Sequence, residues 1–370
     1  MASPSVIDIE SLLQPISDES PTGQDPREDS SPLSIYQQIK TARYAARDAE
    51  KNSLYADDAP DADEYWRKII SETPKLLTTQ AKDLDVATWF TEAMTRRYGF
   101  AGLRDALLLI EGLVAKFWDG LFPMPDEDGI ETRVAQLAGL NGRSSDGVLI
   151  VPIRRIPITE GYTPGPFAYY QYQQAVEIER ISNEETKESR SEKLGFTLAT
   201  IEQAVAHSDV SFFTNLIDDI ADVLACCKRL EDNLEALCGL DDAPSMRSII
   251  AVVEECRAAV SHLTKDILIA EADDQGVTDS ISDSNENASP QKIDKNQARD
   301  IIDNREAAFK KLLEISDFFK KTEPHSPISY ALEKAVKWGN MALDELIVEL
   351  IPDDSARRHF TMLTGVQHHD

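Results

Sequence analysis

Two apolar stripes with helical spacing, joined by a short turn, constrain the fold of this chain more than any other feature of its sequence. The first stripe advances in steps of three and four residues, and its members are Phe213, Leu216, Ile220, Val223, Cys227, Leu230, Leu234 and Leu237. The second advances in the same way, and its members are Ile249, Val253, Cys256, Val260, Leu263, Ile267 and Ala270. Residues 239–244 between them are rich in Gly, Asp and Pro. The pattern predicts an antiparallel αα-hairpin with its seam inside one chain, and an intermolecular coiled coil is the alternative.

Similar spacing over most of the remaining chain predicts a mainly α protein. Apolar residues at such intervals indicate helices over residues 7–13, 33–51, 65–80, 83–120, 134–140, 167–181, 294–321, 328–338, 343–350 and 354–363. Asp83 is the expected N-cap of the long segment 83–120, which Gly99 and Gly102 interrupt. Residues 147–161 differ, because β-branched side chains alternate there with prolines. We therefore expect a short extended or edge-strand segment at that point.

Changes in composition divide the predicted fold into a helical N-terminal domain, a helical-hairpin middle region and a small helical C-terminal module. Residues 1–181 form the first part, 194–270 the second and 294–370 the third, which is the expected oligomerisation module. Residues 182–193 are charged and are expected to be an exposed connection. Residues 271–290 contain six acids and no base, so we predict a flexible acidic linker over 271–293.

The charge of the chain limits the partners that it can take. Its 370 residues carry 38 Lys and Arg against 66 Asp and Glu, a formal net charge of −28. Such a charge repels phosphate backbones and anionic lipid, so we expect neither nucleic acid nor membrane insertion. The same acidity also serves solubility. Because residues 1–10 lack a signal-peptide pattern and no apolar stretch is long enough to span a bilayer, we expect a cytoplasmic protein.

Motifs of catalysis and metal binding are absent from the sequence. It contains no Gly-rich phosphate loop, GxSxG elbow, HExxH helix or paired-cysteine zinc spacing. Cys226 and Cys227 are neighbours on a predicted helix, about 100° apart, and cannot both face one metal ion. With Cys238 and Cys256 they are expected to be small buried side chains in a reducing compartment. We therefore predict no enzyme, no metal and no cofactor.

Two stretches resemble the TssA (ImpA) family of type VI secretion proteins. The first extends from Ile9 to Pro123, and its most specific parts are residues 82–93 (KDLDVATWFTEA), 99–105 (GFAGLRD) and 117–123 (FWDGLFP). The second, residues 325–341 (HSPISYALEKAVKWGNM), is similar to the C-terminal module of the shorter TssA subclass. The loop Gln24–Asp29 departs from the pattern of the family, which leaves its role open.

The resemblance implies a subunit that assembles into a ring at the cytoplasmic base of the secretion apparatus. It further implies contacts with baseplate, tail-tube and sheath components. The alternative is a soluble cytosolic adaptor or chaperone for secreted cargo, which would form a small oligomer, and an enzyme with an unrecognised site is a third hypothesis.

The C-terminal module supports self-assembly independently, because a unit of about 40 residues rarely buries so many apolar side chains alone. The candidate oligomerisation residues are Tyr330, Leu332, Val336, Trp338, Met341, Leu343 and Leu346. Alternatively, these side chains pack on the 294–321 helix of their own chain, and the two arrangements are compatible.

Overall fold

The computed structural model describes residues 2–52, 61–127, 129–142, 145–161, 163–277, 305–322 and 327–341. They fall into two compact units, Met1–Ser282 and Asp283–Asp370, and each is considered by itself. Both units are built from helices, so the predicted mainly α fold is confirmed. None of the described helices is both long enough and apolar enough to cross a membrane.

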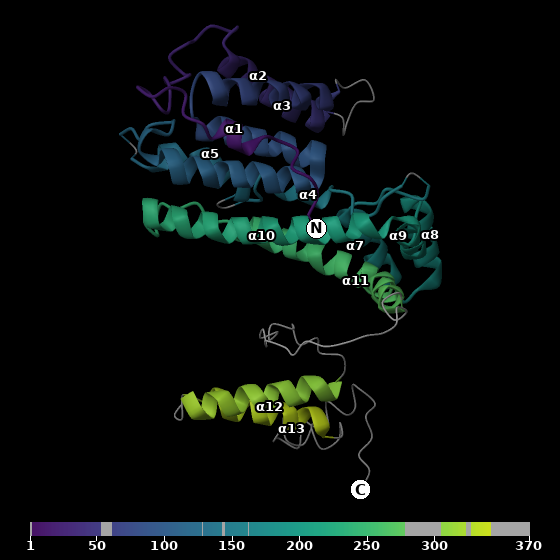
Figure 1. The fold of residues 1–370 in the computed structure, drawn as a ribbon. Helices are drawn as coiled ribbons and strands as arrows, with labels where there is room; N and C mark the ends of the chain where they lie inside the picture. The colour runs from purple at the N-terminus through teal and green to yellow at the C-terminus, as the bar shows by residue number, and fades with distance from the viewer. Residues whose placement is uncertain are drawn as a thin grey trace, which may run out of the picture. The chain divides into compact units, whose positions relative to one another are not determined.

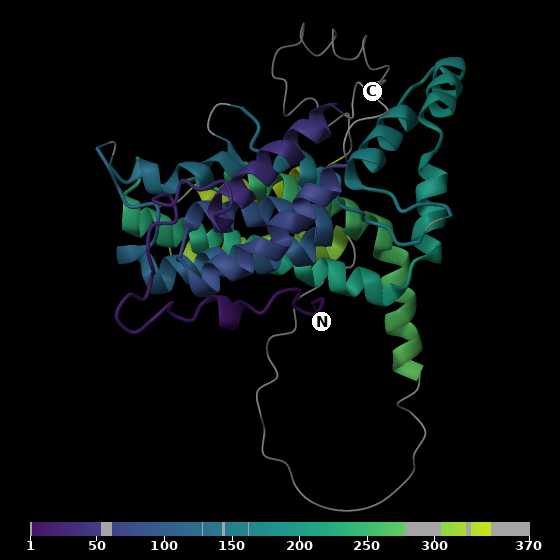
Figure 2. The ribbon, with the colours of Figure 1, turned by 90° about the horizontal axis from the view of Figure 1, so that it is seen from above.

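The first unit is a stack of helix pairs. Its helices are α1 (Ile9–Leu12), α2 (Ile35–Asn52), α3 (Ala62–Thr79), α4 (Leu84–Phe117), the 3-10 turn η1 (Trp118–Gly120), α5 (Glu131–Asn141), α6 (Ile150–Arg154), α7 (Tyr169–Glu179), α8 (Glu184–Leu194), α9 (Leu198–His207), α10 (Val210–Cys238) and α11 (Arg247–Val277). Figure 1 shows α2 and α3 side by side, then α4 with α5, then α10 with α11. In Figure 2, α8 and α9 lie at one end of the unit.

Helix α4 is the centre of this stack, because it packs against α3, α5 and α10. As predicted, Asp83 caps it, and the Asp83 carboxylate accepts a 2.9 Å hydrogen bond from the Val86 N–H. Gly99 breaks the helix into two with φ 58° and ψ −136°, a conformation that favours glycine. Gly102 permits the close approach of the two halves, since a Cβ there would lie 2.3 Å from the Met94 carbonyl oxygen. The interruption expected at these glycines is confirmed.

The predicted αα-hairpin is present as α10 and α11, which pack against each other within the chain. Leu230 and Leu234 are fully buried, whereas Leu237 is 42% exposed near the turn that joins the two helices. The opposite side of α10 lies against α4, and one hydrophobic core contains buried residues from Leu12 to Val260. The expected boundary between an N-terminal domain and a middle region is therefore not a boundary of the core. Periodicity predicted the helices, but not that α10 would be covered on two sides.

The segment 147–161 corrects a second expectation. Ile150–Arg154 is the short helix α6, not a strand. Pro152 is its third residue, where a missing N–H removes no intrahelical hydrogen bond. Extended backbone does occur just beyond α6, where Pro157 forms an isolated bridge with Ala168 and the Ile158 N–H donates to the Phe167 carbonyl at 2.8 Å.

Helix also replaces irregular structure in the charged segment 182–193, which contains most of α8. Asn183 caps it, Glu184 and Glu185 lie in its first turn, and Gly195 ends it in the left-handed conformation. The segment is exposed as expected, since α8 contains no buried residue. Helix α11 likewise continues to Val277, seven residues into the predicted linker. Residues 278–293 of that linker lie outside the described residues.

The second unit contains a helical hairpin of α12 (Arg305–Thr322) and α13 (Ile328–Asn340). The buried Ser316 hydroxyl donates to the Ser329 carbonyl at 2.9 Å, and Lys320 pairs with Glu333. Residues 294–304 and the helices expected over 343–350 and 354–363 lie outside the described residues.

Candidate functional site

The structure places five of the seven candidate oligomerisation residues, all on or next to α13. Val336 is buried in the hairpin, Leu332, Trp338 and Met341 are half-buried, and Tyr330 is 64% exposed. Leu343 and Leu346 lie outside the described residues. The set is therefore divided: Val336 stabilises the hairpin itself, and Tyr330 faces solvent.

Apolar side chains from α12 extend the exposed surface of this hairpin. Leu313 is 42% exposed and Ile315 39% exposed, in addition to Tyr330 on α13. Large exposed aromatic and aliphatic side chains are typical of interaction surfaces. Sequence reasoning missed Leu313, and its signal was a second apolar position beside the predicted stripe of the 294–321 helix.

Trp338 combines a packed ring with an unsatisfied polar group. The Lys334 ammonium lies 4.9 Å from the ring centroid, a cation–π contact. The indole Nε1–H is buried and has no hydrogen-bond acceptor among the residues that the structure describes. Buried N–H groups are nearly always paired, so an acceptor from outside these residues would complete the site.

The Gln24–Asp29 loop, whose role the sequence left open, anchors the start of α4. Arg27 donates to the Asp83 carboxylate at 2.6 Å and to the Asp85 carboxylate at 2.7 Å. Its guanidinium also lies 5.0 Å from the Tyr36 ring centroid. Burial raises the pKa of Asp83 above the ordinary aspartate range, and Arg27 opposes that shift by stabilising the carboxylate. The loop is thus a structural clamp between the N-terminal segment, α2 and α4.

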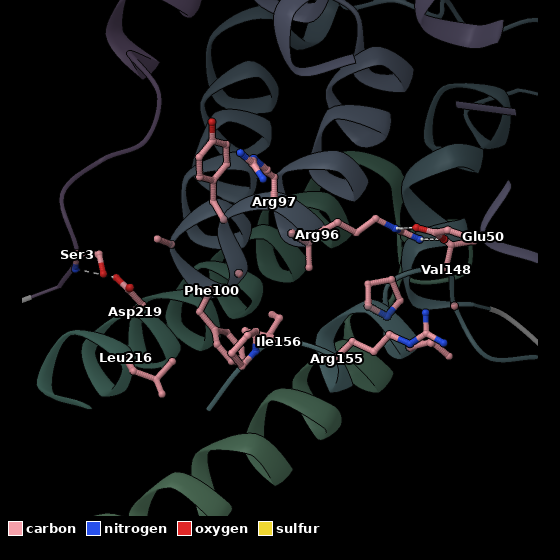
Figure 3. A pocket seen from close by; sticks show the side chains of 18 of the residues that line it. Ser3, Glu50, Arg96, Arg97, Phe100, Val148, Arg155, Ile156, Leu216 and Asp219 are labelled. Carbon is pink, nitrogen blue, oxygen red and sulfur yellow. Dashed lines mark hydrogen bonds and ion pairs between the residues drawn. The ribbon is translucent and has the colours of Figure 1, made fainter. Parts of the chain in front are cut away.

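A groove of about 890 Å³ opens at the Gly99 kink of the first unit. It is lined by the C-terminal part of α2, the residues around the kink in α4, the segment 146–157 and the first turns of α10. Phe100, Ile156 and Leu216 are buried side chains in its wall, and Figure 3 shows them close together. In the same view Arg96 pairs with Glu50, at 2.6 Å, and Asp219 accepts from the Ser3 N–H at 3.0 Å. No feature of the sequence pattern predicted this groove, because its residues come from five separate segments, including Ser3 near the N-terminus.

The cysteines form no metal site in the part of the chain that is described. No group of three or more His, Cys, Asp or Glu side chains is placed to hold a metal ion there. All four thiols are free, and Cys226, Cys227 and Cys256 are buried. Burial raises the pKa of the Cys227 and Cys256 thiols to about 12, which keeps both protonated.

Comparison with known proteins agrees with the resemblance found in the sequence. Residues 13–142, from the end of α1 to the end of α5, match the family model described as ImpA, N-terminal, type VI secretion system. The type VI secretion system component TssA1 of Pseudomonas aeruginosa is 23% identical over 363 residues, which cover 94% of this chain and 96% of that protein. A solved structure of the N-terminal domain of the TssA component from Burkholderia cenocepacia, including the conserved ImpA_N region, matches with a TM-score of 0.57. That match has 25% sequence identity and covers 70% of this chain and 94% of that one.

The layered helical unit and the matched region together define an ImpA-type N-terminal region, a region described for the type VI secretion system. The component of that system to which the chain is homologous is TssA, and the predicted kinship with the TssA (ImpA) family is confirmed.

Proposed function

We propose that this type VI secretion component is a structural assembly subunit, without enzymatic activity, that forms a ring-shaped homo-oligomer in the cytoplasm. The ring associates with the baseplate and supports assembly of the tail tube and sheath. Homology to TssA supports the assignment of this chain to the type VI secretion system. The observation that carries self-assembly is the α12–α13 hairpin, where Tyr330 is 64% exposed and the buried Trp338 N–H has no acceptor in the described part of the chain.

The physical argument concerns the small size of this hairpin. Two helices of 18 and 13 residues enclose few side chains, so a neighbouring subunit can cover the apolar positions that they leave exposed. Aromatic side chains dominate such interfaces, because they bury a large area while losing few rotamers. A second copy of the hairpin would cover Tyr330 and supply an acceptor for Trp338.

Native mass spectrometry of the full chain tests this function. A ring requires a mass many times the 41.2 kDa of one chain, whereas the adaptor or chaperone alternative requires a small oligomer. A monomer or dimer at micromolar concentration would refute the scaffold.

Substitution at the exposed aromatic tests the interface. Tyr330→Asp should dissociate the oligomer while leaving the helical circular dichroism unchanged, because the side chain is mostly in solvent within one chain. Tyr44→Asp is the matched control, since Tyr44 on α2 is 59% exposed in the other unit and its replacement should leave the mass unchanged. Retention of the full mass by Tyr330→Asp would place the interface elsewhere.

A further inference from the structure

The groove at the Gly99 kink gathers cations in a strongly acidic chain. Its lining contains five cationic side chains, namely Arg47, Lys51, Arg96, Arg97 and Arg155, and three carboxylates, namely Glu50, Asp146 and Asp219. The whole chain has the opposite balance, 38 Lys and Arg against 66 Asp and Glu. A set of residues with the average composition of this chain would therefore carry more carboxylates than cations, whereas the groove lining carries more cations.

Two of the carboxylates are already neutralised by arginines. Glu50 accepts two hydrogen bonds from Arg96, at 2.6 and 3.1 Å, and Asp219 pairs with the buried Arg104. The cations on the rim are less engaged. Arg97 comes within 3.9 Å of Asp63 with its side chain 49% exposed, and the exposed Arg155 side chain has no ion pair among the described residues. Charge available to a ligand is thus positive.

Helix ends explain part of this distribution. The C-termini of α2, of the first half of α4 and of α6 meet at the groove, and cations are favourable at such ends. That effect stabilises each helix separately, and it does not account for the apolar surface that these cations surround.

The groove also contains exposed apolar side chains. Val151 is 50% exposed and Tyr98 42% exposed, although both line the groove. Figure 3 shows Arg97 and Arg155 apart from each other, with Arg97 above Phe100 and Arg155 to the right of Ile156. Cations separated by apolar side chains do not converge on one compact anion such as phosphate. They suit an extended segment with carboxylates on both sides of an apolar side chain.

We propose that this groove is a docking site for a short acidic segment of a partner protein, with a large apolar residue between its carboxylates. The apolar residue lies against Phe100, Ile156 and Val151, and the carboxylates pair with the two separate cations Arg97 and Arg155. This binding site goes beyond the assembly function, because it lies in the first unit and does not involve the α12–α13 hairpin.

Fluorescence anisotropy with the full chain and a labelled synthetic peptide tests the proposal. The probe has two aspartates on each side of one leucine. Two matched peptides replace either the aspartates by asparagine or the leucine by serine. We expect saturable binding of the probe, and binding weaker by about tenfold or more for each matched peptide.

Charge reversal locates the site. The double variant Arg97→Glu with Arg155→Glu should weaken binding of the probe by about a hundredfold, whereas Arg190→Glu, at an exposed position of α8, should not change it. Thermal melts of each variant serve as the control for folding. As a second route that leaves the charges in place, Val151→Asn replaces the exposed apolar side chain with a neutral polar one and should also weaken binding about tenfold.

Several outcomes would overturn the proposal. One is the absence of saturable binding, and another is equal loss of binding in the Arg190→Glu control. Displacement of the probe by inorganic phosphate, with no effect of the leucine, would show a simple anion site. Tighter binding of a short single-stranded oligonucleotide would indicate a nucleic-acid partner. Tighter binding of the probe after the six acids of residues 271–290 are neutralised would show that this chain's own segment is the occupant.

Discussion

The four thiols of the chain lie at different depths in the first unit. Cys226, Cys227 and Cys256 are buried, and Cys238 is half-buried near the end of α10. Burial raises the pKa of the Cys227 thiol from 9.0 to about 12, which lowers its thiolate fraction at pH 8 by about a thousandfold. We predict that in the folded protein only the half-buried Cys238 thiol reacts quickly with a thiol reagent at pH 8. Cys238→Ser should remove that fast reaction, and the other three thiols should react only after unfolding. Fast labelling of the Cys238→Ser variant would contradict the buried arrangement.

An ion pair between α4 and α10 gives a pH dependence of stability. Arg229 donates to both carboxylate oxygens of Glu111, at 2.7 and 2.9 Å, and these hydrogen bonds lower the pKa of Glu111 below its ordinary 4.5. A carboxyl with a lowered pKa stabilises the fold fully above its unfolded pKa, and the effect is lost as the pH falls through the folded value. Because the Arg229 side chain is 50% exposed, we expect Glu111→Gln to cost about 1 kcal/mol or less at pH 7.

The measurement is urea unfolding of wild type and Glu111→Gln between pH 7 and pH 3.5. The difference in unfolding free energy should shrink below pH 4.5. Glu235→Gln, at an exposed position of α10, the helix that carries Arg229, should show no such difference. A difference that grows on acidification would refute the assignment.

At the scale of elements, the α10–α11 hairpin supplies a test with an internal control. Leu230 is fully buried in the seam, and Leu237, two turns further along the same predicted stripe, is 42% exposed. Leu230→Asp should lower the unfolding free energy by roughly 3 kcal/mol or more, because it buries an unpaired charge. Leu237→Asp should cost about 0.5 kcal/mol or less. Chemical denaturation monitored by circular dichroism measures both, and equal effects would mean that the hairpin is packed differently.

Two helices, α6 and α8, formed where the local sequence pattern did not predict a helix. The β-branched run before Arg154 predicts a strand, but a strand needs a partner for its backbone groups, and α6 instead closes its own hydrogen bonds while burying Ile150 and Ile153. The charged segment of α8 lacks an apolar stripe, yet its caps and end charges are good helix signals that a composition argument overlooks.

At the scale of the whole molecule, the shared core of the first unit predicts its cooperativity. The hydrophobic cluster joins α2, α3, α4, α10 and α11, and Arg104 on α4 binds the Ser3 carbonyl at 2.8 Å and pairs with Asp219 on α10. We therefore expect a fragment of residues 1–277 to unfold in one transition. Leu76 on α3 and Leu230 on α10 are both fully buried. Leu76→Ala and Leu230→Ala should each lower the free energy of unfolding measured for that same transition by about 2–5 kcal/mol. Two separate transitions, each sensitive to one variant, would instead support the predicted division into an N-terminal domain and a middle region.

Local sequence signals were enough to predict the helical character of the chain, the N-cap at Asp83, the break at Gly99 and the αα-hairpin. These features depend on side-chain spacing and backbone preference over a few residues, which the sequence contains locally. The motifs around residues 82–123 also carried the kinship with TssA. Three features could be seen only in the folded chain. They are the clamp of Arg27 on Asp83 and Asp85, the burial of Val336 beside the exposed Tyr330, and the cationic groove. The clamp and the groove bring together segments far apart in the chain, and the division between Val336 and Tyr330 depends on how α13 packs against α12, so the spacing of residues in the sequence specifies none of them.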